Sequence, residues 1–213
     1  MTEINTKSMR NPTEEALFDP FSINSFLQFV DTYRFKVTPQ IRERAFNNML
    51  KNEEYFREGD VFYMKGSDVN KAEEQTAIKL GKAGYYVVFP GKGQKKQIKK
   101  LENDKTLCNN DAYIYNKETF YQQKTDIKAV NGGSIEAIKE HISQGSKQAP
   151  VVVIDMPATT SRWNVINGIR LGWDKDNTKT ILLNWKGRWY NIDKNRAFGK
   201  KKENKNWLEN SIQ

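Results

Sequence analysis

The chain has 213 residues and a mass of 24.8 kDa, which suits one full domain with a smaller unit. Its hydrophobic residues (37%) and aromatic residues (12%) are enough to close a core, which excludes wholesale disorder. One cysteine and one histidine exclude an intramolecular disulfide framework and a multi-cysteine zinc site, and the net charge of +9 indicates a polyanionic partner.

No apolar run approaches the roughly 18 residues that span a bilayer. The first residues lack the apolar segment of a signal peptide. We therefore expect no membrane partner. The expected location is the cytoplasm of a bacterial host or target cell, or a phage particle.

Residues 1–58 are predicted to form a helical N-terminal region. Ser22 can cap a first helix that is rich in apolar residues on one side. A second helix is predicted to begin after Thr38 with Pro39 at its first position, where proline is favoured. The helical pattern continues to Phe56.

Residues 59–193 are predicted to form the main domain, and residues 194–213 a basic tail. The expected elements are a strand at 59–64, a helix at 71–83, strands at 85–90, 111–115 and 119–124, a helix at 135–143, a strand at 151–155, a helix at 162–171, and a hairpin of strands 180–185 and 188–192. The fold class is α+β: an antiparallel-rich sheet backed by helices, behind a small helical subdomain.

Two local signals are specific. Gly84 fits the left-handed position that ends a helix. The apolar run at 151–154 is typical of a central strand buried on both faces.

A lysine-rich loop lies between two expected strands, and we predict that it binds RNA phosphates through Lys92, Lys95 and Lys96.

The hairpin formed by strands 111–115 and 119–124 is the first candidate catalytic element. Gln122 and Lys124 are two residues apart and share one face of their strand, across a short turn from Asp111. A carboxylate beside a lysine can hold a divalent ion and a water, or the lysine can neutralise charge on a phosphorane. Because Gln122 stands where a second carboxylate would be needed, we expect no metal cofactor. Asp111 is the ligand if Mg²⁺ is used.

The helix at 135–143 offers two further candidates. Ser134 caps it, and the free N–H groups of the first turn can bind an anion. His141 is a natural general base or acid near neutral pH for metal-free RNA cleavage, in which the ribose 2′-hydroxyl attacks. It lies about 10 Å along the axis from Ser134, so one phosphate would not easily touch both.

Polar residues on either side of the central strand complete the predicted binding surface. Gln148 precedes the strand and could reach a phosphate or a base edge. Thr159, Thr160 and Arg162 stand at the start of the next helix, where hydroxyls and an arginine suit a phosphate.

Four pieces of the sequence carry a resemblance to a known family. They are the segment 79–90 (KLGKAGYYVVFP), the segment 110–114 (NDAYI), the segment 122–125 (QQKT), and the start of helix 135–143 followed by KQA at 147–149 and VVVID at 151–155. In order and spacing, over residues 65–192, they resemble the tRNA-nuclease domain at the C-termini of contact-dependent inhibition toxins and of some phage head-morphogenesis proteins. That domain is grouped with the barnase, EndoU, colicin and RelE-type ribonucleases.

The resemblance implies endonucleolytic cleavage of RNA, with tRNA as the expected substrate and Lys124, Ser134 and Gln148 among the functional positions. The chain departs from the family in two places: it has Asn110-Asp111 where the family has Pro-Asp, and Gln122 and Gln123 where an acidic residue is typical. The Asp…(Asp/Glu)-x-Lys pattern also resembles restriction-type metal nucleases, which need the carboxylate that Gln122 replaces.

We therefore predict a toxin-type endoribonuclease that cleaves RNA without a metal, with Lys124, His141 and Ser134 as its catalytic residues. A small acidic immunity protein or a phage particle is the expected protein partner. One alternative is a nucleic-acid-binding or phage structural protein without catalysis. The other is a Mg²⁺-dependent restriction-type nuclease.

Overall fold

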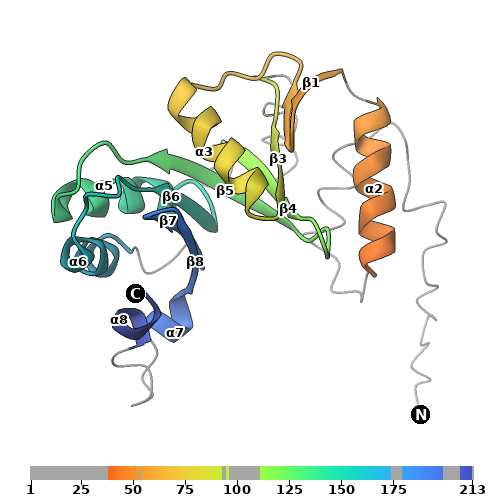
Figure 1. Cartoon of the computed structure of the whole chain (residues 1–213). Coiled ribbons are helices and arrows are strands. Elements are labelled where there is room, and N and C mark those ends of the chain that lie inside the picture. The colour runs from red at the N-terminus through yellow and green to blue at the C-terminus, as the bar shows by residue number, and fades with distance from the viewer. Residues whose placement is uncertain are drawn as a thin grey trace, which may run out of the picture.

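The computed structural model describes residues 38–52, 54–92, 95, 111–173, 179–198 and 207–212. The predicted helix after Ser22, Lys96 and most of the lysine-rich loop lie outside these residues. The described part is built on one mixed sheet with helices on both faces (Figure 1). None of its helices is long and apolar enough to cross a bilayer.

The sheet has eight strands, and each strand lies beside its neighbours in the chain, in the order β1 to β8. The strands are β1 (Tyr55–Glu58), β2 (Val61–Met64), β3 (Tyr85–Phe89), β4 (Ala112–Asn116), β5 (Gln122–Ala129), β6 (Val151–Asp155), β7 (Thr180–Trp185) and β8 (Arg188–Asp193). The pairs β2–β3, β5–β6 and β6–β7 are parallel, and the other four are antiparallel. The predicted α+β class is confirmed.

The helices connect the parallel pairs and cover the sheet. They are α2 (Pro39–Asn52), α3 (Lys71–Lys82), α5 (Ile135–Ser146), α6 (Arg162–Gly172), α7 (Lys194–Phe198) and α8 (Trp207–Ser211). Strand β6 is fully buried, as its apolar run predicts. Its Val152 and Ile154 pack with α5 and α6, and its Val151 and Val153 pack with α3 on the opposite face, because side chains alternate along a strand.

Helix α2 packs on the same face of the sheet as α5 and α6, over β2 to β4. Phe46 of α2 lies 4.7 Å from Tyr115, measured between ring centroids, and Met49 Sδ accepts a hydrogen bond of 3.7 Å from the Tyr115 hydroxyl. The helix begins at Pro39, as predicted, but the expectation of helical structure up to Phe56 is wrong. Residues 55–58 form β1, whose Tyr55 pairs with Met64. The division at residue 58 stays a prediction.

Local sequence signals set the ends of the helices. Asn70 and Glu73 form a capping box at the start of α3, and Gly84 after its end has φ of 100°. Ser134 and Ser161 cap α5 and α6 through their side chains.

The predicted strand at 119–124 differs from the strand observed. The Asn116 side chain accepts hydrogen bonds from the backbone N–H groups of Glu118 and Thr119, which builds a turn over these residues. Phe120, with φ of 49°, completes the reversal. Strand β5 therefore begins only at Gln122, and it continues five residues beyond Lys124 to Ala129.

The contact between α5 and α6 depends on a glycine. A Cβ added at Gly168 would lie 2.5 Å from Ile138 Cβ, whereas one added at Gly132 would lie 3.7 Å from Ala137 Cβ. We expect Gly168→Ala to lower the free energy of unfolding by about 1–3 kcal/mol through overpacking, despite the better helix propensity of alanine. Urea unfolding monitored by circular dichroism measures this. Gly132→Ala is the control, and equal effects of the two substitutions would contradict the packing argument.

Candidate active site at the fork between β4 and β5

Strand β5 lies between β4 and β6, and it pairs with them through different residues. Residues 122–125 pair with β4 on one edge, and residues 125–129 pair in parallel with β6 on the other edge. Asp111 lies just before β4, at the point where the two strands separate. Its N–H donates to the Thr125 carbonyl at 3.1 Å, and its Oδ2 accepts from the Ile127 N–H at 3.1 Å. A carboxylate is thus held in the fork by backbone contacts.

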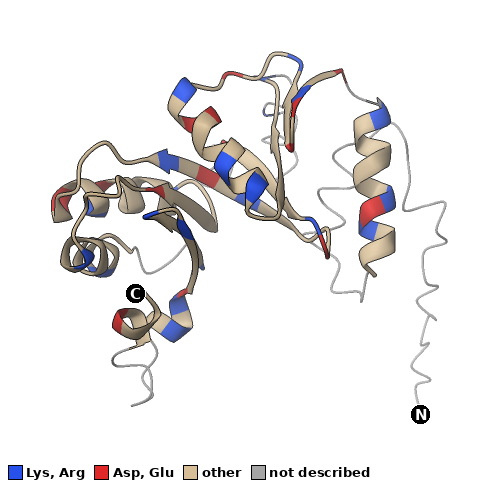
Figure 2. Ribbon diagram, in the orientation of Figure 1, with Lys and Arg blue, Asp and Glu red and all other residues tan. Residues whose placement is uncertain are grey.

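Asp126 and Lys128 lie on the part of β5 beyond the fork, on one face of the strand. Lys128 Nζ lies 2.9 Å from Asp126 Oδ2 and 3.9 Å from Asp111 Oδ2. Figure 2 shows the resulting alternation of basic and acidic positions along β5. One lysine therefore sits between two carboxylates.

Asp126 is fully buried, with 0% of its surface exposed. Helix α5 lies so close that a Cβ at Gly145 would come within 2.7 Å of Asp126 Oδ2. Burial first, and then the hydrogen bond and charge of Asp111, raise the pKa of Asp126 to about 7, although Lys128 opposes the shift. The two carboxyls therefore share a proton up to near neutral pH.

Glu73 approaches the fork from α3, on the opposite face of the sheet. Burial, followed by the charge of Asp111, raises its pKa, while the Asn70 backbone and Lys128 lower it. Its carboxylate accepts from Asn70 in the capping box. It adds a third acidic group to the electrostatics of this site.

His141 belongs to α5 and lies near Lys128 of β5. Burial, and then the charge of Lys128, lower its pKa, so its imidazole is neutral at pH 7. Its Nδ1 is buried and has no hydrogen-bond partner among the described residues. This arrangement leaves a nitrogen on the ring that can accept a proton.

The structure places Gln122 and Lys124 on β5, on the other side of the fork from Lys128. Gln122 pairs in register with Tyr115, and its side-chain amide donates to the Tyr115 hydroxyl at 3.0 Å. It is thus about 13 Å along the strand from the level of Asp111. The expectation that Gln122 stands at the position of a second carboxylate stays a prediction. The carboxylate that lies beside Asp111 is that of Asp126.

Lys124 is nearer to the fork, two residues before Asp126 and on the same face, about 7 Å along the strand. It is mostly buried (8% exposed) and pairs in register with Tyr113. A catalytic role for Lys124 stays a prediction; the contacts of Lys128 with the carboxylates of Asp126 and Asp111 are direct.

Several other residues that the sequence predicted for the site lie in other parts of the fold. The Ser134 hydroxyl accepts from the Ala137 N–H at 3.2 Å and caps α5. Gln148 lies in the turn after α5, and Thr159 and Thr160 lie in the turn after β6. Arg162 Nε donates to the Ile212 carbonyl at 2.5 Å, so its guanidinium holds the C-terminal helix.

The described part of the lysine-rich loop lies near the N-terminal side of α3. Lys92 forms an ion pair of 3.2 Å with Asp68, and its backbone N–H donates to the Gly66 carbonyl. Lys95 is partly buried. Neither is among the residues that meet at the fork.

The donor set at the fork fits a hard divalent cation. Mg²⁺ usually keeps several waters and binds one or two carboxylates together with substrate phosphates. Asp111 and Asp126 supply two adjacent carboxylates, and their shared proton shows that they need a positive charge to ionise together. The described residues contain no group of three or more His, Cys, Asp or Glu arranged to hold a metal ion. A cation here would therefore rely on water or phosphate for its other ligands.

No protein-family model and no curated protein matches the chain. Among solved structures, it is similar to a chain of the CdiA-CT/CdiI toxin and immunity complex from Burkholderia pseudomallei. The sequence identity is 20%, the match covers 61% of this chain and 96% of that chain, and the TM-score is 0.40. At this TM-score the likeness carries no argument, so function rests on the residues at the fork.

Sequence reasoning missed Asp126 and Lys128, although a usable signal was present. Asp126-Ile127-Lys128 is itself an (Asp/Glu)-x-Lys string, downstream of Asp111. The expected strand ends at residue 124, so the string lies outside it. No sequence motif marks Glu73 as part of the site.

The raised pKa of Asp126 predicts a pH dependence of stability. Between its unfolded value of 3.8 and its folded value of about 7, the folded chain binds a proton that the unfolded chain does not. The free energy of unfolding therefore falls as pH rises through this window. Asp126→Asn cannot ionise and should lose this dependence.

The measurement is urea unfolding of the parent and of Asp126→Asn at several pH values from 4 to 8, without divalent cations. The difference in unfolding free energy, variant minus parent, should become more positive with pH by on the order of a few kcal/mol. A difference that stays constant over this range would show that Asp126 ionises normally.

Proposed function

We propose that the chain is a metal-dependent nuclease of the restriction type, with its active site at the β4–β5 fork. The observation that supports this most directly is the contact of Lys128 with Asp126 beside Asp111. Asp111 and Asp126 would hold Mg²⁺, and Glu73 would add negative charge at the margin of the site. This reverses the expectation of a metal-free reaction.

The residues of the fork have separable roles in phosphodiester hydrolysis. When bound, Mg²⁺ supplies Lewis-acid stabilisation of the negative charge that develops on the phosphate. Lys128, held by Asp126, places a second positive charge where it can orient an attacking water and neutralise the phosphorane. The charge of Mg²⁺ would also displace the proton that the two carboxyls share.

RNA is the proposed substrate, and tRNA is its expected form. The net charge of +9 suits a polyanion, and the resemblance of segments 79–90 and 147–155 to a tRNA-nuclease domain favours RNA. Toxin activity and inhibition by a small acidic protein are proposals that rest on the same resemblance. Expression of the chain in bacteria, with growth as the readout, tests the first.

A specific observation keeps the metal-free reaction as a second candidate. His141 is neutral at pH 7, carries a buried Nδ1 that no described residue binds, and lies near the Lys128 ammonium. A neutral imidazole beside a cation could take the proton of a ribose 2′-hydroxyl. The two candidates differ in their need for Mg²⁺ and in which residue is essential.

The decisive experiment is cleavage of total RNA, purified tRNA and duplex DNA by the purified protein, with Mg²⁺ or with EDTA. We expect cleavage of RNA with Mg²⁺ and none with EDTA. Lys128→Met should reduce the rate by about 100-fold or more, since a charge that stabilises the transition state is removed. The matched control is Lys139→Met, which removes an exposed lysine of α5.

The other outcomes identify the alternatives. Cleavage in EDTA that His141→Ala abolishes would establish the metal-free reaction. Retarded migration of RNA on a gel without cleavage would indicate a binding protein. Cleavage of DNA alone would overturn the proposed substrate.

Metal binding can be measured apart from activity. Mg²⁺ should raise the melting temperature of the parent at pH 7.5, because it binds only the folded arrangement of Asp111 and Asp126. At pH 5.5 the effect should be smaller, since the shared proton competes with the metal. Differential scanning fluorimetry measures both, with Asp126→Asn as the control. Equal stabilisation of the parent and of this variant would place the metal elsewhere.

A further inference from the structure

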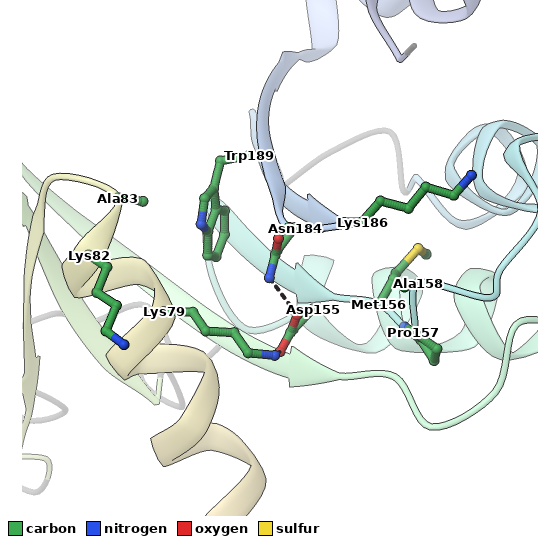
Figure 3. Close-up of a pocket in the computed structure, with 11 residues that line it drawn as sticks. Lys79, Lys82, Ala83, Asp155, Met156, Pro157, Ala158, Asn184, Lys186 and Trp189 are labelled. Carbon is green, nitrogen blue, oxygen red and sulfur yellow. Dashed lines mark hydrogen bonds and ion pairs between the residues drawn. The ribbon is translucent and has the colours of Figure 1, made fainter.

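A pocket of about 570 Å³ lies apart from the fork, between α3 and the carboxyl ends of β6 and β7. Its walls come from the last turns of α3, the segment after β6 and the β7–β8 hairpin (Figure 3). It opens on the α3 face of the sheet, whereas Asp126 and Lys128 point to the opposite face. None of the predicted site residues lines it.

The floor of the pocket is a polar network centred on Asp155, which is 9% exposed. Lys79 Nζ lies 2.6 Å from Asp155 Oδ2, and Thr76 Oγ1 lies 3.2 Å from the same oxygen. The Asn184 side-chain amide donates to Asp155 Oδ1 at 2.8 Å. Because these groups neutralise and orient the carboxylate, the floor is rigid and does not repel an anion.

Two further lysines line the rim of the pocket. Lys82 and Lys186 are exposed, and neither has an ion pair with a described carboxylate. Lys186 Nζ lies 4.4 Å from the ring centroid of Trp185, which packs with α5 and α6 on the opposite face of the sheet, so its ammonium is directed away from Asp155 and Trp189 (Figure 3). A phosphate in the pocket could therefore be contacted by Lys82.

Trp189 supplies an aromatic wall. It is half-buried, packs against the core on the α3 face and lies opposite Asn184 in the β7–β8 register. Figure 3 shows its indole ring standing across the pocket from Lys82, with Pro157 and Ala158 on a third side. An aromatic face beside a lysine is a combination that binds single-stranded nucleic acid, because the base stacks on the ring and the lysine contacts a phosphate.

Helix α3 connects this pocket to the fork. Glu73 at its first turn approaches Asp111, while Lys79 and Lys82 line the pocket about 9 to 14 Å further along the same axis. The pocket and the Asp126–Lys128 pair lie on opposite faces of the sheet, so a strand bound at both would pass around the edge of β5 beside Asp111.

We propose that this pocket is a nucleotide subsite, which holds one unpaired base of the nucleic acid against Trp189 and a neighbouring phosphate on Lys82. The proposal rests on the proposed function, since it takes the ligand to be the strand cleaved at the fork. It implies that the enzyme selects single-stranded or looped RNA over duplex.

The test is binding of a short single-stranded RNA in EDTA, measured by fluorescence anisotropy over a range of salt concentrations. Under the proposed Mg²⁺ dependence EDTA prevents cleavage, so binding is read separately from catalysis. Trp189→Ala should weaken binding at least about fivefold, and Trp189→Phe, which keeps a stacking face, should restore most of it. The control is Trp163→Ala, which removes a tryptophan that is 69% exposed and outside the pocket.

Lysine variants test the phosphate contacts. Lys82→Ala should reduce the slope of log affinity against log salt by about 0.7, the value for one contact to a single strand. Lys186→Ala and Lys139→Ala should leave the slope unchanged. The melting temperature of every variant shows whether it folds.

The outcomes separate the two proposals. Loss of binding in Trp189→Ala and recovery in Trp189→Phe would support the subsite even if the parent cleaves nothing. Cleavage with Mg²⁺ at a parental rate and affinity in Trp189→Ala would overturn the subsite and leave the active site standing. Equal effects of Trp189→Ala and Trp163→Ala would also overturn it, as would an unchanged salt slope in Lys82→Ala.

Discussion

The candidate site depends on one constraint: β5 must pair with two different strands. Strand β6 is apolar from Val151 to Ile154 and is buried on both faces, and it pairs in parallel with β5 and β7. Strand β5 forms its pairing with β6 through residues 125–129, after pairing with β4 through residues 122–125. Beyond Thr125, β4 no longer pairs with β5. Asp111, just before β4, contacts the backbone of β5 there instead.

This geometry explains why charged side chains occur inside the sheet. Asp126 and Lys128 point to the face covered by α5, where burial alone would disfavour both charges. Their mutual contact and the nearby Asp111 make the arrangement tolerable, but at neutral pH it still holds two carboxyls that resist joint ionisation. A divalent cation bound between these carboxyls would remove that conflict. The same pair of carboxyls that lowers the stability of the protein would therefore give it affinity for a metal.

Local signals made much of the fold predictable. Pro39, Asn70, Gly84, Ser134 and Ser161 mark helix ends, and capping acts over three or four residues, within reach of sequence reasoning. The strand at 119–124 was misplaced because Asn116 organises a turn that the alternating aromatic pattern conceals. Strand β1 was missed for a related reason: all four of its residues are exposed, so no apolar pattern marks it.

By itself, the sequence determined the α+β class, the buried central strand, the positive charge and the presence of Asp111, because each is a property of composition or of short-range pattern. Only the tertiary structure decided which lysine and which second carboxylate join Asp111. That choice depends on the register at which β4 leaves β5, which is set by the pairing of β5 with a strand about 25 residues downstream. The pocket beside Trp189 likewise combines three distant segments, whose meeting is determined by the packing of α3 on the sheet.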